Sequence, residues 1–209
     1  MTRLAALVSG SGRNLQSLID AIEAGELDAR IEVVIASRSG IPAIERARHH
    51  GIPVEVVSRK AAPSLEAFQA ELQAALARYP VDLICLCGFL SFLSPDIVAR
   101  YRGRIMNIHP SLLPAFSGKG FYGKNVHAEV LNYGCKVTGC TVMFVDEGED
   151  TGPIILQEAV PVYDDDTPET LEARVMQAEY RLYPRAVALF ASGRLSLVGR
   201  RVRILPELR

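Results

Sequence analysis

The sequence predicts an α/β protein built on a single doubly wound, mostly parallel sheet. Over the first half of the chain, short apolar segments alternate with segments of helical periodicity, which is the pattern of parallel strands joined by right-handed crossovers. Two segments, Leu4–Ser9 and Leu83–Cys87, are almost entirely apolar, as buried central strands are. Beyond residue 137 two strand patterns are separated only by a short acidic loop, which predicts an antiparallel C-terminal extension of the sheet.

Composition bounds the class of protein. The chain has 209 residues, a formal net charge of −1, 49% hydrophobic residues and 22% charged residues. This is ordinary for a globular protein, and it offers no global basic field for nucleic acid or a membrane surface. The first apolar run is too short to span a membrane and lacks a signal-peptide cleavage pattern. We therefore expect one cytoplasmic domain over residues 1–209, as a monomer or homodimer, with no nucleic-acid or membrane partner.

The four cysteines do not form a C-x-x-C pair. Buried thiols in a reducing compartment are the favoured interpretation, and a zinc site is a weaker alternative because the ligand spacing is wrong. The cysteines are Cys85, Cys87, Cys135 and Cys140.

Each strand of the first half is followed by a helix. The helix over Ser64–Tyr79 is expected to turn Leu65, Phe68 and Leu72 inward and to end before Pro80. In chain order the expected strands are Leu4–Ser9, Ile31–Ser37, Val54–Val57 and Leu83–Cys87, and the expected helices are Leu15–Ala24, Pro42–His50, Ser64–Tyr79 and one capped by Ser94-Pro95-Asp96.

The second half begins with a strand at Ile105. Ala115–Lys124, rich in glycine, lysine and aromatic residues, is mobile by composition. The long helix Glu169–Ser192 carries an apolar stripe at intervals of three and four, and Pro184 is expected to kink it. The other expected elements are a helix at Val126–Tyr133, strands at Val137–Val145 and Ile154–Val162, and a hairpin of Leu195–Val198 with Val202–Leu205.

Two polar residues stand at the end of the strand that begins at Ile105. Side chains alternate along a strand, so Asn107 and His109 share one face, roughly 7 Å apart. Pro110 has no N–H to donate, so the strand ends there. Ligands of open parallel sheets bind at the carboxyl ends of strands, which favours a site over a surface histidine beside a turn.

The loop from Ser9 to Asn14, rich in glycine and serine, joins the first strand to the first helix. Backbone N–H groups and the helix dipole at such a junction favour an anion. The loop lacks the third glycine of a dinucleotide fingerprint and the Gly-Lys-Ser/Thr of a P-loop, so a single phosphate is the better interpretation. A plain strand-to-helix turn is an equal alternative on this loop alone.

Three further segments are candidates. The apolar residues from Gly88 to Leu93 would line a pocket for a flat heterocycle or belong to the core. The acidic loop Asp146–Pro153 is a solvated turn by default, and the alternative is that one carboxylate turns back towards His109. It lacks EF-hand spacing for Ca²⁺. Glu179 adjoins the apolar stripe of the long helix, at the edge of a cleft or on the surface.

Three motifs together resemble one family. They are Ser9-Gly10-Ser11-Gly12-Arg13-Asn14-Leu15-Gln16, Asn107-Ile108-His109-Pro110-Ser111-Leu112-Leu113-Pro114, and Gly139-Cys140-Thr141-Val142 continuing to Asp150-Thr151-Gly152-Pro153. Over nearly its whole length the chain resembles the folate-dependent phosphoribosylglycinamide formyltransferases. The resemblance implies a Rossmann-like formyltransferase fold, with a phosphate-binding half at about 1–100 and a catalytic, folate-binding half at about 101–209.

The resemblance also implies an activity. A formyl group would pass from 10-formyltetrahydrofolate to the amine of 5-phosphoribosylglycinamide, in purine (IMP) biosynthesis, without a metal. Asn107 and His109 would stabilise the tetrahedral oxyanion, and Asp150 would orient His109. Leu113-Pro114 would be a cis peptide. The binding residues implied are Gly12, Arg13, Asn14 and Glu179 for the substrate, and Leu90, Ser91, Phe92, Leu93, Asn107, Val145, Asp146 and Asp150 for the folate.

Other functions stay open. Another folate-dependent formyltransferase, a formyltetrahydrofolate deformylase, and a non-catalytic module that binds a nucleotide phosphate are the alternatives. The non-catalytic module is disfavoured because a protein that only binds has no need of a histidine paired with an acid, and the chain retains Asn107, His109 and Asp150. Five positions depart from the family's pattern and bear on affinity more than on chemistry, namely Leu65, Ser91, Met143, Glu149 and Met176.

Overall fold

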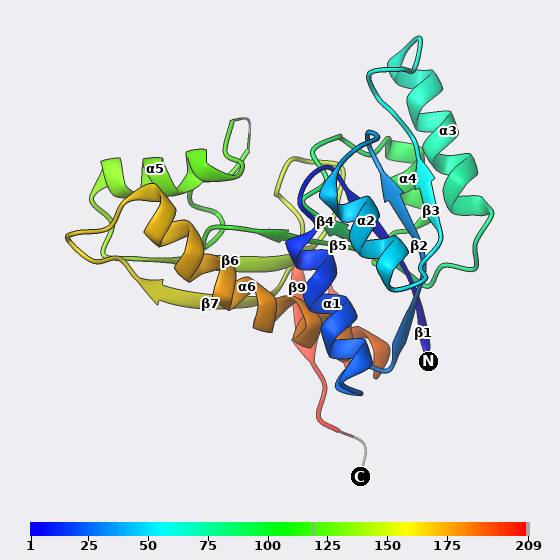
Figure 1. Cartoon of the computed structure of the whole chain (residues 1–209). Coiled ribbons are helices and arrows are strands. Elements are labelled where there is room, and N and C mark those ends of the chain that lie inside the picture. The colour runs from blue at the N-terminus through cyan, green and yellow to red at the C-terminus, as the bar shows by residue number, and fades with distance from the viewer. Residues whose placement is uncertain (119, 208–209) are drawn as a thin grey trace. The chain divides into compact units, whose positions relative to one another are not determined.

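The computed structural model describes residues 1–118 and 120–207, so Lys119 of the Ala115–Lys124 loop lies outside the described residues. Seven strands form one sheet in the order β3-β2-β1-β4-β5-β6-β7, and β8 and β9 form a separate two-stranded sheet. The chain divides into two compact units, Met1–Met106 and Asn107–Arg209, coloured blue to green and green to red in Figure 1. The predicted α/β class, with a mostly parallel sheet and an antiparallel C-terminal part, is confirmed.

Unit 1 is a parallel α/β layer structure. Strand β1 pairs in parallel with β2 on one side and with β4 on the other, and Val8 lies opposite both Ala36 and Cys87. The carboxyl ends of these three strands are therefore level. The elements are β1 (Thr2–Val8), α1 (Arg13–Glu23), β2 (Ala29–Ala36), α2 (Pro42–His49), β3 (Val54–Val56), α3 (Leu65–Ala77), β4 (Leu83–Cys87) and α4 (Pro95–Arg100).

The core of unit 1 follows the apolar runs of the sequence. Leu4–Val8 on β1 and Leu83–Cys87 on β4 are buried, which confirms them as central strands. One inward assignment is wrong, because Leu65 is 49% exposed. It is the first residue of α3, and Phe68 is the first residue of this helix that is fully buried in the core.

Unit 2 contains the antiparallel part. Strand β6 pairs with β7, and α6 packs against both strands and against α5. The predicted apolar stripe on α6 is confirmed, since Leu171, Val175 and Leu182 are buried, and α6 continues through Pro184. The elements are β5 (Ile105–His109), which starts in unit 1, α5 (Lys124–Tyr133), β6 (Val137–Phe144), β7 (Ile154–Pro161), α6 (Pro168–Ala191), β8 (Leu195–Val198) and β9 (Arg201–Ile204).

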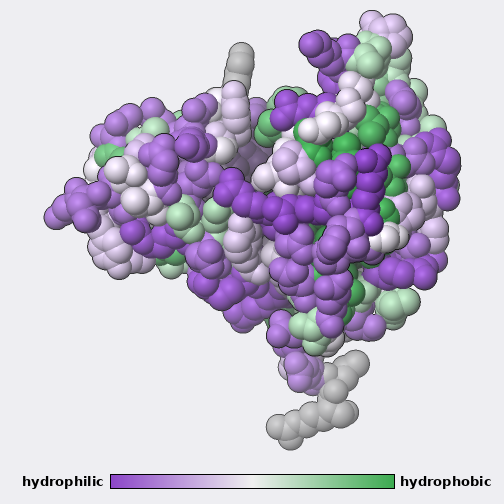
Figure 2. Space-filling view, in the orientation of Figure 1, coloured by the Kyte–Doolittle hydropathy of each residue, from purple (hydrophilic) through white to green (hydrophobic). Residues whose placement is uncertain are grey.

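The surface of the protein carries both hydrophilic and apolar residues. Figure 2 shows mostly hydrophilic residues on this face, with apolar residues gathered around α1 and α2 of unit 1. Cys85, Cys87 and Cys140 are buried as expected, whereas Cys135 is only half-buried. Among the described residues no helix combines the length and the apolar character that crossing a membrane requires.

Candidate active site

The end of β5 presents the two polar residues that the sequence singled out. The strand ends at His109, because Pro110 cannot donate to a neighbouring strand. His109 is 4% exposed, while Asn107, two residues earlier on the same face, is half-buried. Among the described residues, the Asn107 side chain has no hydrogen-bond partner. Its amide is therefore available as a donor to a ligand.

Asp150 faces His109 across unit 2. Its Oδ2 lies 3.4 Å from Nδ1 of His109, and the two side chains are 13% and 6% exposed. The N–H of Gly118 also donates to Oδ2 of Asp150, at 3.3 Å. The acidic loop is thus not simply a solvated turn: Glu147 and Glu149 are exposed, but Asp150 turns inward to the histidine.

The loop that carries Asp150 is shaped by its own side chains. Oδ1 of Asp146 accepts hydrogen bonds from the N–H of Gly148, at 3.1 Å, and from Oγ1 of Thr151, at 2.6 Å. Asp150, inside this clamp, has a φ of +54°, a left-handed conformation that is uncommon for a residue with a side chain. The clamp holds the backbone in the strained conformation that aims Asp150 at His109.

Gly152 closes the same loop. The N–H of Phe144 donates to the oxygen of Pro153 at 2.9 Å, which joins the two ends of the loop. A Cβ on Gly152 would lie 1.7 Å from the oxygen of Phe144. Only glycine fits, which explains the glycine at position 152.

The second nitrogen of His109 has a backbone partner. Nε2 lies 2.9 Å from the oxygen of Phe116, a residue with a φ of +50°. Both ring nitrogens thus face an acceptor, Asp150 on one side and Phe116 on the other. A doubly protonated ring can donate to both at once.

A buried network holds the segment between His109 and Phe116. Oγ1 of Thr141 donates to the oxygen of Ser111 at 2.7 Å and accepts from the N–H of Leu113 at 3.1 Å. Nε2 of Gln157 donates to the oxygen of Leu113 and to Oγ1 of Thr141. The expected cis peptide at Leu113-Pro114 is present. The segment after β5 is therefore fixed by β6 and β7.

Glu179 is buried on α6, not on the surface. It lies near the thiol of Cys140 on β6, whose pKa is raised by burial first and then by the charges of Glu179 and Glu158. Met143, also on β6, is buried as well. Among the other positions that depart from the family pattern, Glu149 is exposed and Met176 is half-buried.

The loop after β1 in unit 1 leads directly into the N-terminus of α1. Gly12 caps α1 with a φ of +71°, and a Cβ there would lie 2.7 Å from Cβ of Ala43. The exposed Arg13 donates from Nε to Oγ of Ser11 at 3.2 Å. Asn14 follows in the first turn of the helix, where N–H groups have no partner within the helix.

Two arginines that sequence reasoning missed approach this loop. Arg46 on α2 donates to the oxygen of Ser11 at 2.8 Å, and Arg38 donates to the oxygen of Ser9 at 3.0 Å. They come from elsewhere in the chain, so only the assembled unit reveals them. With Arg13 they give the loop a positive surrounding that suits a phosphate.

The segment Leu90–Leu93 is an exposed apolar turn after β4. Leu90 and Phe92 are 64% and 66% exposed, so they are not core residues. The N–H of Leu90 donates to Oγ of Ser9 at 2.9 Å, and Gln69 on α3 donates to the oxygen of Phe92. Ser91 and Leu93 are half-buried between these anchors. The turn offers an apolar surface for a flat ring.

Sequence reasoning also missed a buried histidine. His127 on α5 is 2% exposed, and its Nδ1 has no hydrogen-bond partner among the described residues. Burial lowers the pKa of His127, the charge of Glu172 opposes this, and His109 lowers the pKa slightly further. A lone histidine on a helix gives no signal in a single sequence.

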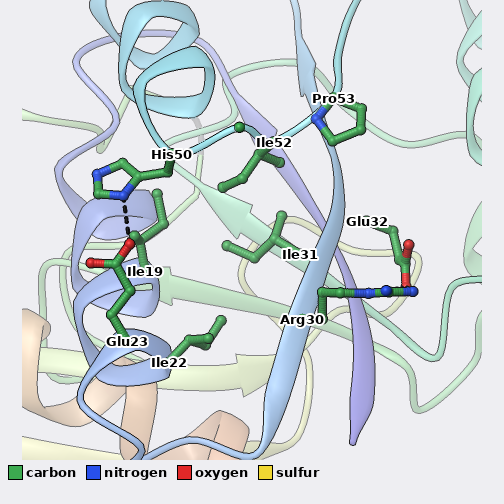
Figure 3. Close-up of a pocket in the computed structure, with 10 residues that line it drawn as sticks. Ile19, Ile22, Glu23, Arg30, Ile31, Glu32, His50, Ile52 and Pro53 are labelled. Atoms are coloured by element: carbon green, nitrogen blue, oxygen red, sulfur yellow. Dashed lines mark hydrogen bonds and ion pairs between the residues drawn. The ribbon is translucent and has the colours of Figure 1, made fainter.

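A cavity of about 410 Å³ in unit 1 is separate from these groups. Figure 3 shows isoleucine side chains in its middle and the ion pair of His50 with Glu23, at 2.7 Å, on its rim. It opens between the end of α1, the start of β2 and the residues after α2. It therefore lies at the amino end of β2, opposite the end where β1 leads into the Ser9–Asn14 loop. No metal-binding cluster is found among the described residues.

Comparisons with known proteins identify the family of this chain. Residues 2–187 match the formyl transferase family model. The chain is 44% identical to the bovine trifunctional purine biosynthetic protein adenosine-3, over 93% of this chain and 19% of the relative. It is 37% identical to phosphoribosylglycinamide formyltransferase of Escherichia coli (strain K12), over 93% and 89%.

The fold comparison adds a solved structure. Glycinamide ribonucleotide transformylase 1 from Symbiobacterium toebii superposes with a TM-score of 0.93 and 46% identity, over 99% of this chain and 95% of that one. The chain spans about a fifth of the length of the trifunctional relatives and most of the length of the single-function ones. With the family model covering most of the sequence, the chain belongs to the formyl transferase family.

Proposed function

We propose that this chain transfers the formyl group of 10-formyltetrahydrofolate to the amine of 5-phosphoribosylglycinamide. The observation that carries the proposal is the largely buried pair of His109 and Asp150. His109 ends the strand that also presents Asn107, Asp150 lies in the loop between β6 and β7, and the chain belongs to the formyl transferase family. The names of the relatives give the acceptor and the pathway, purine biosynthesis. The reaction needs a folate cosubstrate and no metal.

The chemistry is an acyl transfer. The acceptor amine attacks the formyl carbon, a C–N bond forms, and the carbonyl oxygen becomes an oxyanion. The Asn107 amide donates a hydrogen bond to that oxyanion, a contribution of about 10²–10³ in rate for one well-placed donor. The intermediate then collapses, the bond to the folate nitrogen breaks, and that nitrogen takes a proton.

His109 and Asp150 act as one unit in this step. The imidazolium form of His109 stabilises the oxyanion and gives its proton to the leaving folate nitrogen. The neutral ring then takes the proton that the attacking amine releases, and such a placed acid and base contributes about 10²–10⁴ in rate. Asp150 holds the ring in orientation and balances its charge at 3.4 Å. Because both side chains are largely buried, water screens this charge pair weakly.

The binding groups are assigned by their chemistry. We assign the acceptor phosphate to Gly12, Arg13 and Asn14, supported by the left-handed Gly12 and the three nearby arginines. The acceptor amine is assigned to Glu179. The pterin is assigned to Leu90–Leu93, supported by exposed Leu90 and Phe92, and to Val145, Asp146 and Asp150.

The test is an absorbance assay with 10-formyltetrahydrofolate or 10-formyl-dideazafolate, with and without 5-phosphoribosylglycinamide. Deformylated folate that appears only with the acceptor, in step with formylated product, is expected. Folate turnover without acceptor would instead identify a deformylase.

The matched variants are His109→Ala and His49→Ala. His49 is exposed on α2, so its replacement controls for the loss of a histidine. We expect His109→Ala to abolish transfer while calorimetric titration still detects the phosphate ligand. Near wild-type turnover by His109→Ala would refute the mechanism.

A further inference from the structure

The C-terminal hairpin reaches back to the loop that carries Asp150. Arg200, next to Gly199 in the turn between β8 and β9, donates from Nη2 to the backbone oxygen of Thr151 at 2.7 Å. The family model matches residues 2–187, so this arginine lies outside the matched segment. A guanidinium donor makes this a charge-assisted hydrogen bond, which is stronger than one between neutral groups.

Thr151 is consequently held from two sides. Its hydroxyl donates to Asp146 within the loop, and its carbonyl accepts from Arg200 of the hairpin. Thr151 directly follows Asp150, whose φ of +54° is strained and persists only where surrounding contacts enforce it. Fixing the peptide after Asp150 limits how far its backbone can relax towards an unstrained conformation.

We propose that Arg200 is a positioning residue for the transfer reaction, fixing Asp150 against His109 through the Thr151 carbonyl. The inference rests on the proposed function. Arg200 touches neither substrate nor the reacting atoms; its effect passes through the Asp150 carboxylate. A contact of 3.4 Å between buried groups is sensitive to displacement, because reacting groups displaced by about 1 Å lose up to about 10² in rate.

The kinetic test compares Arg200→Ala with Arg203→Ala. Both replacements remove one arginine from the same hairpin, but only Arg200 bonds Thr151. We expect Arg200→Ala to lower kcat about tenfold, with the KM for the acceptor nearly unchanged, and Arg200→Lys to recover part of the loss. Equal effects of the two alanine variants would overturn the proposal.

A double-mutant cycle separates positioning from general damage. If Arg200 acts only through Asp150, then Arg200→Ala has little further effect on kcat in an Asp150→Asn background. The pH–rate profile of the single variant Arg200→Ala also moves in the same direction as that of the single variant Asp150→Asn. Fully additive losses, or an unmoved profile, would count against Arg200.

A readout independent of turnover distinguishes this proposal from the proposed function. In protein labelled with ¹⁵N-histidine, Asp150→Asn identifies the imidazole resonances of His109 that respond to the carboxylate. Arg200→Ala should move the same resonances in the same direction, and Arg203→Ala should not. That result supports Arg200 even if the acceptor assay shows no transfer, and unchanged resonances in Arg200→Ala would overturn it even if transfer is normal.

Discussion

Nε2 of His109 and the backbone oxygen of Phe116 lie 2.9 Å apart, so the ring nitrogen that points away from Asp150 is already occupied. His109 can offer that nitrogen to a substrate only after Phe116 shifts. Binding of the acceptor phosphate compound with a non-reactive folate analogue should therefore change amide hydrogen exchange over residues 111–118. The exchange of β3 is the internal reference, because no ligand group is assigned to this strand. Unchanged exchange of that segment at saturating ligand would show that His109 acts with Phe116 in place.

Asp150→Asn should lower kcat by at least about tenfold, because the neutral amide no longer balances a charged His109. Steady-state kinetics with both substrates measures the effect. Glu149→Gln is the control, since it removes the neighbouring acid, which is exposed. If both variants lose activity alike, the total charge of the loop matters and not the Asp150 carboxylate.

Gly152→Ala should destabilise unit 2, because a methyl group would lie 1.7 Å from the oxygen of Phe144 and the backbone must move to admit it. Overpacking of this kind costs about 1–3 kcal/mol of the free energy of unfolding. Denaturant unfolding measures it, with Gly10→Ala as the control, because a Cβ at Gly10 meets no atom within 4 Å. Equal stabilities of the two variants would contradict the close approach.

His127 should make stability fall in mild acid. Its pKa is lowered from 6.5 by burial, so the unfolded chain binds a proton more readily than the folded one below that pH. The free energy of unfolding should decrease as the pH falls from about 6.5 towards the folded pKa, and be unaffected by His127 above about 7.5. Unfolding curves of His127→Gln should lack this part of the decrease, while His49→Gln, at an exposed position, keeps it. Parallel pH profiles of wild type and His127→Gln would exclude the effect.

Much of the fold was predictable because its elements have strong local patterns. The runs in β1 and β4 and the stripe on α6 are set by nearest neighbours along the chain, so a single sequence reveals them. Asn107 and His109 were predictable for the same reason, since Pro110 marks the end of their strand. The resemblance to a known family supplied Asp150, whose distance from His109 along the chain hides the pairing.

The other features of the candidate site depend on contacts that cannot be deduced from the residue types. The oxygen that faces His109 belongs to the backbone of Phe116, and any residue at 116 would carry one. Arg200 meets Thr151 from a distant hairpin, and Arg46 reaches Ser11 from another helix. The inward prediction for Leu65 is wrong because periodicity gives the face of a helix but not which of its turns is covered, and the first residue of α3 is exposed.

The close approach of Gly12 to Ala43 restricts which residues can occupy these two positions. Glycine at residue 12 lies against a small residue, Ala43. A Cβ added at residue 12 would lie 2.7 Å from the Cβ of Ala43. A larger residue on α2 would press on the Ser9–Asn14 loop while leaving its own sequence intact. Natural variants of this chain can therefore lose the shape of that loop through a substitution at a site that looks unrelated to it. Position 12 should itself remain glycine, because a Cβ there would also lie 2.9 Å from the backbone Cα of Ala43.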